Sequence, residues 1–160
     1  MDRWRIAARP ITHPDAARLV AEVQAEYVVR YGTPDESPIP DGYFADPQGA
    51  FFVGYLDDEP VATGAWHRRS DVEALGSANA AEIKRMYVVP AVRGTGRARA
   101  MLANLEETAA AAGSEVMVLE TGTEQPEALA LYASAGYQPI PGFGFYRDSP
   151  LNRCLARSLS

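Results

Sequence analysis

The sequence predicts one domain of the α+β class over residues 1–160, with a mixed and mostly antiparallel central sheet and helices on both of its faces. Three observations support this fold. Short apolar runs alternate along the chain with helical patterns, which indicates strands and helices within one domain. The middle of the chain holds several strand-like runs in succession without a helix between them, as in antiparallel sheets. With 160 residues, 47% of them hydrophobic, the chain can bury a self-supporting core.

The first third of the chain predicts a strand, a long helix and a loop. Residues 4–8 form the strand candidate. Pro14 suits the first position of the helix, in which apolar residues recur with helical spacing until Gly32 ends it. Residues 33–49 are rich in Pro, Asp and Gly and therefore predict a loop.

A β-hairpin is predicted to begin the rest of the fold. Two apolar runs, residues 50–56 and 61–68, flank a short polar turn and are expected to pair as antiparallel strands. The elements that follow are a strand over residues 82–89, a helix from near Arg97 that Gly113 ends, a strand over 116–120, a helix over 126–135 and one or two closing strands within 144–159.

Composition argues against several classes of protein. The formal net charge of −6 disfavours nucleic acid or an anionic membrane as the main partner. Cys154 is the only cysteine, so neither a disulfide framework nor a zinc cluster is expected, and no residues have metal-ligand spacing. The chain begins with charged residues and lacks a run of about 18 apolar residues, so we expect a cytoplasmic protein without a signal peptide or membrane span.

The most informative motif is a glycine-rich turn, Arg-Gly-Thr-Gly-Arg-Ala, at residues 93–98. It lies between a predicted strand and the start of a predicted helix, where free backbone N–H groups and the helix dipole attract an anion. Gly94 and Gly96 can adopt positive φ and let the backbone approach the anion closely. The turn also supplies arginines. It therefore predicts a pyrophosphate site.

The spacing of the turn narrows the choice of ligand. A dinucleotide fingerprint would need a third glycine where Arg99 stands, and a Walker A loop would need Gly-Lys-Ser/Thr. Both spacings argue against another kind of nucleotide enzyme. Arg93, Gly96 and Ala98 instead fill the pattern [Q/R]-x-x-G-x-[G/A], and the sequence Ile-Lys-Arg-Met-Tyr-Val precedes it at residues 83–88.

Together these motifs resemble the acyl-CoA signature of the GNAT superfamily of N-acyltransferases. The resemblance covers nearly the whole chain. It implies acetyl-CoA as the acyl donor, and a strand whose backbone is left free by a bulge to bind pantetheine. The residues that it implies for binding acetyl-CoA are Met86, Tyr87, Val88, Arg93, Gly94, Thr95, Gly96, Arg97 and Ala98. Gln125 is a further candidate, standing near the position where many relatives have an Asn.

A second block, Leu-Tyr-Ala-Ser-Ala-Gly-Tyr at residues 131–137, resembles the last helix of the same superfamily. By position, the resemblance assigns Tyr132 as the general acid that protonates the departing CoA thiolate. A phenol of pKa about 10 remains protonated at neutral pH, which suits that role. The alternative is that Tyr132 only packs in the core. The superfamily mechanism is direct attack of an amine on the thioester, without an acyl-enzyme.

An amine nucleophile must lose a proton, so a general base is expected. Glu82 is the first candidate, and Glu120 and His67 are its rivals. The alternative for Glu82 is an exposed strand-end carboxylate paired with Lys84 or Arg85. Glu120 has the alternative role of binding the cationic amine. His67 stands among basic residues, which favours a surface position or binding of a substrate anion.

The acceptor pocket is expected between the first helix, the loop that follows it and the closing strands. Its candidate residues are Tyr31, Phe44, Glu120 and Tyr146. Arg68, Arg69 and Arg147 are available for a substrate carboxylate. We therefore expect an N-acetyltransferase that acts on a primary amine of a small molecule or amino-acid-like acceptor. The alternatives are a non-catalytic acyl-CoA-binding module and a protein or peptide N-acetyltransferase, and a homodimer is left open.

Overall fold

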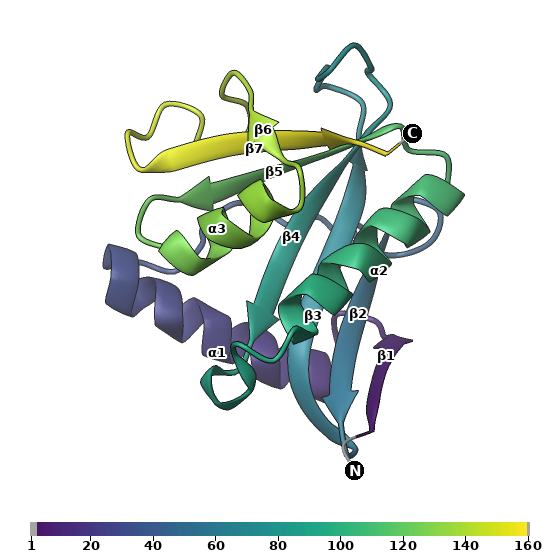
Figure 1. The fold of residues 1–160 in the computed structure, drawn as a ribbon, viewed down its shortest axis with the longest axis vertical. Helices are drawn as coiled ribbons and strands as arrows, with labels where there is room; N and C mark the ends of the chain where they lie inside the picture. Colours follow the sequence, from purple (N-terminus) through teal and green to yellow (C-terminus); the bar gives the residue numbers. More distant parts are fainter. Residues whose placement is uncertain (1–2, 160) are drawn as a thin grey trace.

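The computed structural model describes residues 3–159 and confirms the predicted α+β class (Figure 1). Over this range seven strands form one sheet: β1 (Trp4–Ala8), β2 (Gly49–Leu56), β3 (Glu59–Arg69), β4 (Ala80–Val88), β5 (Val116–Gly122), β6 (Gln138–Pro139) and β7 (Asn152–Ser158). Their spatial order is β1-β2-β3-β4-β5-β7-β6. The pair β4–β5 is parallel and the other neighbours are antiparallel, so the sheet is mixed as expected.

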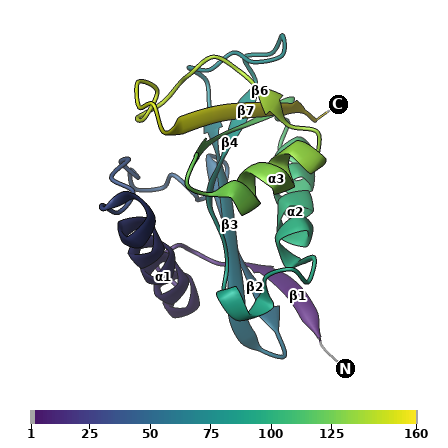
Figure 2. The ribbon, with the colours of Figure 1, turned by 60° about the vertical axis from the view of Figure 1, so that its left-hand side comes forward.

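Helices cover both faces of the sheet, as Figure 2 shows. Helix α1 (Pro14–Tyr31) lies on one face, while α2 (Arg97–Ala111) and α3 (Pro126–Ser134) lie on the other, and a 3-10 turn (Pro90–Val92) precedes α2. Each face has its own apolar core. Leu19 and Val23 of α1 pack in the first, and Met101, Leu102 and Leu105 of α2 pack in the second. The two cores hold the sheet between the helices.

The predicted helix boundaries agree with the structure to within about two residues. Pro14 is the first residue of α1, and Gly32 ends it with a φ of 81°. The closing region contains one of the one or two strands expected there. One closing strand, β7, lies within residues 144–159, whereas β6 lies earlier, at Gln138–Pro139. A two-residue strand is too short to show a period of its own, and β6 exists only because it pairs with β7.

The two parallel strands β4 and β5 diverge after their first four paired residues. Their pairing ends at Ile83 and Leu119, although β4 continues to Val88 and β5 to Gly122. Figure 1 shows the resulting opening between the two arrows. A register shift between β3 and β4 accompanies the divergence, and Arg85 has a φ of 57° there. This is a β-bulge, which bends a strand away from its neighbour.

Among residues 3–159, no helix combines the length and apolar character that crossing a membrane requires.

Candidate active site

A cavity of about 790 Å³ opens where β4 and β5 diverge. Elements from across the chain line it: residues 83–88 of β4, 119–122 of β5, the glycine-rich turn, and side chains from α1, α3 and the loop before β7. The cavity therefore brings together segments that the sequence analysis had singled out separately. Its size is within the range of pockets for small molecules and cofactors.

The glycine-rich turn presents open backbone to this cavity. Gly94 and Gly96 both have positive φ, of 80° and 84°. A Cβ built at either residue would have no atom of the described chain within 4 Å, so the space beside the turn is free. Gly96 is the N-cap of α2 and no side chain caps that end of the helix. The first-turn N–H groups can thus face an anion, as the pyrophosphate of CoA requires.

The side chains of the turn are engaged elsewhere, which differs from the arginine-rich site that the sequence suggested. Arg93 lines the cavity, but its Nε donates to the Val88 carbonyl at 3.0 Å and its Nη2 to Glu26 at 2.8 Å. The Arg97 guanidinium lies 5.3 Å from the centre of the Trp4 ring, and the Thr95 hydroxyl donates to the Val92 carbonyl. The backbone amides are therefore the main anion-binding groups that this turn offers.

Gly96→Asp tests the cradle. The added carboxylate should occupy the open space beside the turn and repel phosphate. We expect at least a tenfold loss of affinity for CoA, about 1.4 kcal/mol, with folding retained because Asp tolerates positive φ better than most residues. Isothermal titration measures the affinity, and Gly42→Asp, at an open loop position with a φ of 79°, is the matched control. Unchanged binding by a folded Gly96→Asp variant would remove this turn from the CoA site.

Tyr132 reaches the cavity from α3. Its side chain is buried, lines the cavity and packs edge-on against Tyr137, with ring centroids 5.5 Å apart. Its hydroxyl donates no hydrogen bond to any other residue of the described chain. Burial raises the pKa of Tyr132, so the phenol keeps its proton at neutral pH. The residue is therefore a core aromatic whose protonated phenol lines the cavity.

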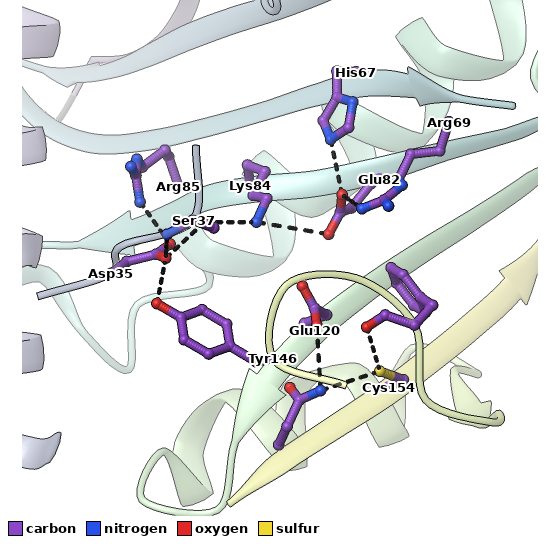
Figure 3. Close-up of polar contacts among 12 residues, drawn as sticks. Asp35, Ser37, His67, Arg69, Glu82, Lys84, Arg85, Glu120, Tyr146 and Cys154 are labelled. Carbon is purple, nitrogen blue, oxygen red and sulfur yellow. Dashed lines mark hydrogen bonds and ion pairs between the residues drawn. The ribbon is translucent and has the colours of Figure 1, made fainter. Parts of the chain in front are cut away.

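The side chain of Glu82, the first candidate for the base, is fully buried, so the alternative of an exposed strand-end carboxylate is wrong. Oε1 accepts hydrogen bonds from His67 Nε2 at 2.8 Å and Arg69 Nη1 at 2.9 Å (Figure 3). Burial alone would raise the pKa of Glu82, but the His67 hydrogen bond and the positive charge of Lys84 outweigh it and hold the pKa below the usual range. A carboxylate held in its ionised form in this way is a weak base.

His67 is also buried, so its predicted surface position is wrong. Its ring stacks on Tyr43 with centroids 3.8 Å apart, and its Nδ1 lies 3.1 Å from the Arg68 carbonyl oxygen. Neither His67 nor Glu82 contributes to the lining of the large cavity among the described residues. The pair is a structural cross-link between β3 and β4, on which the two residues are direct cross-strand partners.

Glu120 is one of the carboxylates that line the cavity, together with Glu26, Asp35 and Glu127. It lies on β5 just beyond the last residue paired with β4. Oε1 accepts a hydrogen bond from Asn152 Nδ2 at 3.2 Å, and Oε2 is buried without a partner among residues 3–159. Burial raises the pKa of Glu120, and the nearby charge of Glu82 raises it further. A Cβ on Gly144 would lie 2.7 Å from Oε2, so the glycine leaves room for this carboxylate.

The other predicted acceptor residues divide into two groups. Tyr31 and Tyr146 line the cavity, and Gln125, which also lines it, donates to the Tyr31 hydroxyl at 3.3 Å. Tyr146 accepts from the backbone N–H of Glu36 at 2.7 Å. Phe44 instead packs in the core, with its ring centroid 5.9 Å from that of Phe51, and the structure leaves it outside the lining of the cavity.

The arginines proposed for a substrate carboxylate also lie elsewhere. Arg68 donates to the Pro47 carbonyl, Arg69 binds Asp71 and Glu82, and Arg147 lines a smaller pocket. Lys84 and Arg85 line the large cavity, and Lys84 also lies 3.7 Å from Glu82 Oε2. No cluster of three or more His, Cys, Asp or Glu that could hold a metal is found within the described residues.

The sequence of this chain is similar to those of known acetyltransferases. Residues 16–137 match the acetyltransferase (GNAT) family. An IAA acetyltransferase of Azospirillum brasilense is 38% identical over 78 residues, which are 49% of this chain and 51% of that relative. The chain thus spans about half of that protein. An uncharacterized N-acetyltransferase of Escherichia coli strain K12, YjgM, is 29% identical over 134 residues, covering 80% of this chain and 77% of the relative.

Solved structures show the same fold. A candidate acyl-CoA N-acyltransferase from Klebsiella pneumoniae superposes with a TM-score of 0.77 and 26% identity, covering 98% of both chains. The overall fold of this chain is therefore shared with that protein.

Proposed function

This chain belongs to the GNAT family of acetyltransferases, and on that premise we propose that it transfers the acetyl group of acetyl-CoA to the primary amine of a small molecule. The observation that carries the proposal is that one cavity is lined by the glycine-rich turn, by Tyr132 and by Glu120. Anion binding, an acid and a base are thus available around one space. All the strands of the described chain, from β1 near its start to β7 near its end, belong to one sheet. This supports a single catalytic domain.

The backbone supplies the donor site in this proposal. The free amides at Gly96 and the first turn of α2 bind the pyrophosphate of CoA. Met86, Tyr87 and Val88 line the cavity on the side of β4 that has lost its pairing with β5. Their backbone groups are available to bind the pantetheine chain and to stabilise the oxyanion that forms on the acetyl carbonyl. Gln125 contributes a side-chain amide from the start of α3.

The reaction is direct transfer in a complex of both substrates. The amine nitrogen attacks the acetyl carbonyl, a C–N bond forms, and the C–S bond of the thioester breaks. Glu120 accepts the proton that the amine loses, and Tyr132 gives its proton to the departing thiolate. Solvent then restores both groups. The products are an N-acetylated amine and CoA with a free thiol.

We assign the base to Glu120 rather than to Glu82 for two reasons. Glu120 lines the cavity and has an unpartnered oxygen, whereas Glu82 is enclosed by His67 and Arg69. The pKa of Glu120 is raised and that of Glu82 is lowered, and a raised pKa makes a carboxylate the stronger base.

Release of free thiol from acetyl-CoA in the presence of an amine panel tests the proposal. The panel should contain small amines, amino acids and peptides with free N-termini, each at saturating acetyl-CoA. We expect thiol release that depends on the amine, together with an acetylated product seen by mass spectrometry. Acetyl-CoA binding without amine-dependent release would instead support the non-catalytic acyl-CoA-binding module, and release with peptides alone would support a protein N-acetyltransferase.

A further inference from the structure

We propose that the acceptor carries a carboxylate in addition to its amine, and that Arg85 binds this carboxylate with Lys84 beside it. The inference rests on the proposed acetyl transfer and narrows its acceptor to amino carboxylates. It arises from Arg85 and Lys84, which the donor site and the proton transfers leave unused, and from their placement in the same cavity as Glu120.

Arg85 is a buried cation with a hydrogen-bond donor that has no partner in the described part of the chain. Its side chain is 5% exposed and lines the cavity. Nη1 donates to Asp35 Oδ2 at 2.9 Å, while Nε is buried without a partner among residues 3–159 (Figure 3). A guanidinium has five N–H donors and matches a carboxylate in two-point geometry. A buried donor without a partner costs free energy, so a ligand that accepts from it gains affinity.

Asp35 holds Arg85 in position but leaves it able to bind a second anion. Its Oδ1 already accepts from the backbone N–H and hydroxyl of Ser37, at 2.9 and 2.6 Å, and from the Tyr146 hydroxyl at 2.9 Å. Asp35 is therefore fixed by several contacts, and through Oδ2 it fixes one edge of the guanidinium. The pKa of Asp35 is held low by these hydrogen bonds although burial opposes them, so the carboxylate stays ionised.

The backbone at Arg85 supports a functional interpretation. A φ of 57° is sterically unfavourable for arginine, and such strain in an ordered strand is concentrated at binding and catalytic sites. Lys84 adds a second cation to the wall. Its Nζ donates to Ser37 Oγ at 3.2 Å and lies 3.7 Å from Glu82 Oε2. An ammonium has three donors, so these contacts leave Lys84 able to approach an anion.

Glu120 provides the complementary group in the same cavity. Its buried, unpartnered Oε2 accepts from the acceptor's amine, and the unpartnered Nε of Arg85 donates to the acceptor's carboxylate. An alkylamine would satisfy only the first of these groups. An amino carboxylate satisfies both, and buried polar groups in folded proteins are normally hydrogen-bonded. The two orphaned atoms therefore select a ligand with an amine and a carboxylate.

Matched acceptors test this proposal. Each of several amino acids, both α-amino acids and ω-amino acids of increasing length, is compared with its carboxamide and with the amine that lacks the carboxyl group. We expect the wild-type protein to show kcat/KM at least tenfold higher for the carboxylate of the preferred series. Arg85→Gln should reduce that preference to about unity, mainly through KM, because the carboxylate contact is present in both ground and transition states. Arg147→Gln removes an arginine outside the large cavity and should keep the preference.

Each outcome decides the matter. Equal use of carboxylate and carboxamide by the wild-type protein would overturn the inference while leaving acetyl transfer to amines intact. A folded Arg85→Gln variant that keeps the full preference would also overturn it. If Arg85→Gln does not fold, the acceptor series with the wild-type protein and with Lys84→Gln tests the inference. Lys84→Gln is expected to weaken the preference for the carboxylate. Failure to acetylate any amine would refute the proposed function itself.

Discussion

Glu120→Gln is expected to lower kcat by about 10²–10⁴-fold, the usual contribution of a positioned general base. The change keeps the shape of the side chain and removes its ability to accept a proton from the amine. The amide can still contact Asn152, so the walls of the cavity should stay in place. Binding of acetyl-CoA should change little, because Glu120 acts on the acceptor. Steady-state thiol release and isothermal titration measure the two quantities.

The pH profile distinguishes a base from a residue that merely shapes the pocket. The pKa of Glu120 is raised by burial, so in the wild-type protein kcat/KM should increase as the pH rises above the usual carboxyl range and Glu120 loses its proton. Glu120→Gln should lack this increase, and its residual rate should follow the ionisation of the amine alone. Glu82→Gln is the companion variant. Glu82→Gln should keep the increase of kcat/KM with pH. It should lower the free energy of unfolding, because His67 and Arg69 would face a neutral amide.

Glu120→Gln should not destabilise the fold at neutral pH. A carboxyl with a raised pKa binds more protons when folded than when unfolded, so its contribution to stability falls as the pH rises above the unfolded pKa. Glutamine removes this penalty. We expect thermal unfolding of Glu120→Gln to be unchanged or higher at neutral pH, in keeping with the cost that functional groups impose on stability. A variant with wild-type kcat and pH profile would exclude Glu120 as the base.

The sequence could predict those parts of the molecule that have local signals. Gly32 ends α1 and Gly96 opens α2, and both have the positive φ that glycine tolerates. The glycine-rich turn lines the cavity because a strand followed by a helix always places its loop at one edge of the sheet. The motif that contains Tyr132 also predicts the helix that carries it, and Tyr132 lines the cavity.

The environment of the carboxylates could not be predicted in the same way. His67 and Glu82 face each other because β3 and β4 pair in one register, and nothing within either strand encodes that register. The sequence therefore leaves an exposed strand-end position open for Glu82, which is fully buried. Glu120 reaches the cavity because β5 loses its partner beyond Leu119. The end of this pairing depends on both strands and has no signal in the sequence of β5 alone.

Arg85 was missed as a cavity residue for a related reason. In a regular strand its neighbours would alternate between the two faces, but the bulge breaks this alternation and residues 83–88 all line the cavity. Bulges that begin with a non-glycine residue have no reliable sequence signal. The loop at residues 33–49 is expected to border the acceptor pocket, but its composition does not indicate that Asp35 contacts Arg85 and Tyr146. Such contacts depend on three segments far apart in the chain.

Tyr132→Phe should reduce kcat by about 10²-fold, near the low end of the range for acid catalysis, because a CoA thiolate is already a fair leaving group. The change removes one hydroxyl and keeps the ring that packs against Tyr137, so the fold should be preserved. Burial raises the pKa of Tyr132, so the phenol is protonated over the whole neutral range and the loss should not vary with pH there. The dissociation constant of acetyl-CoA should stay the same, since the proton moves only in the transition state.

Tyr137→Phe is the matched control for this variant. Tyr137 is the ring partner of Tyr132, but its hydroxyl donates to Glu106 at 2.8 Å and, among the described residues, it does not line the cavity. Loss of the Tyr137 hydroxyl should lower the free energy of unfolding without lowering kcat. Thiol release at several pH values, with the best acceptor of the amine panel, compares both variants with the wild-type protein. Wild-type kcat in Tyr132→Phe across that range would remove the hydroxyl from the mechanism, and weaker acetyl-CoA binding with unchanged kcat would make Tyr132 a donor-binding residue instead.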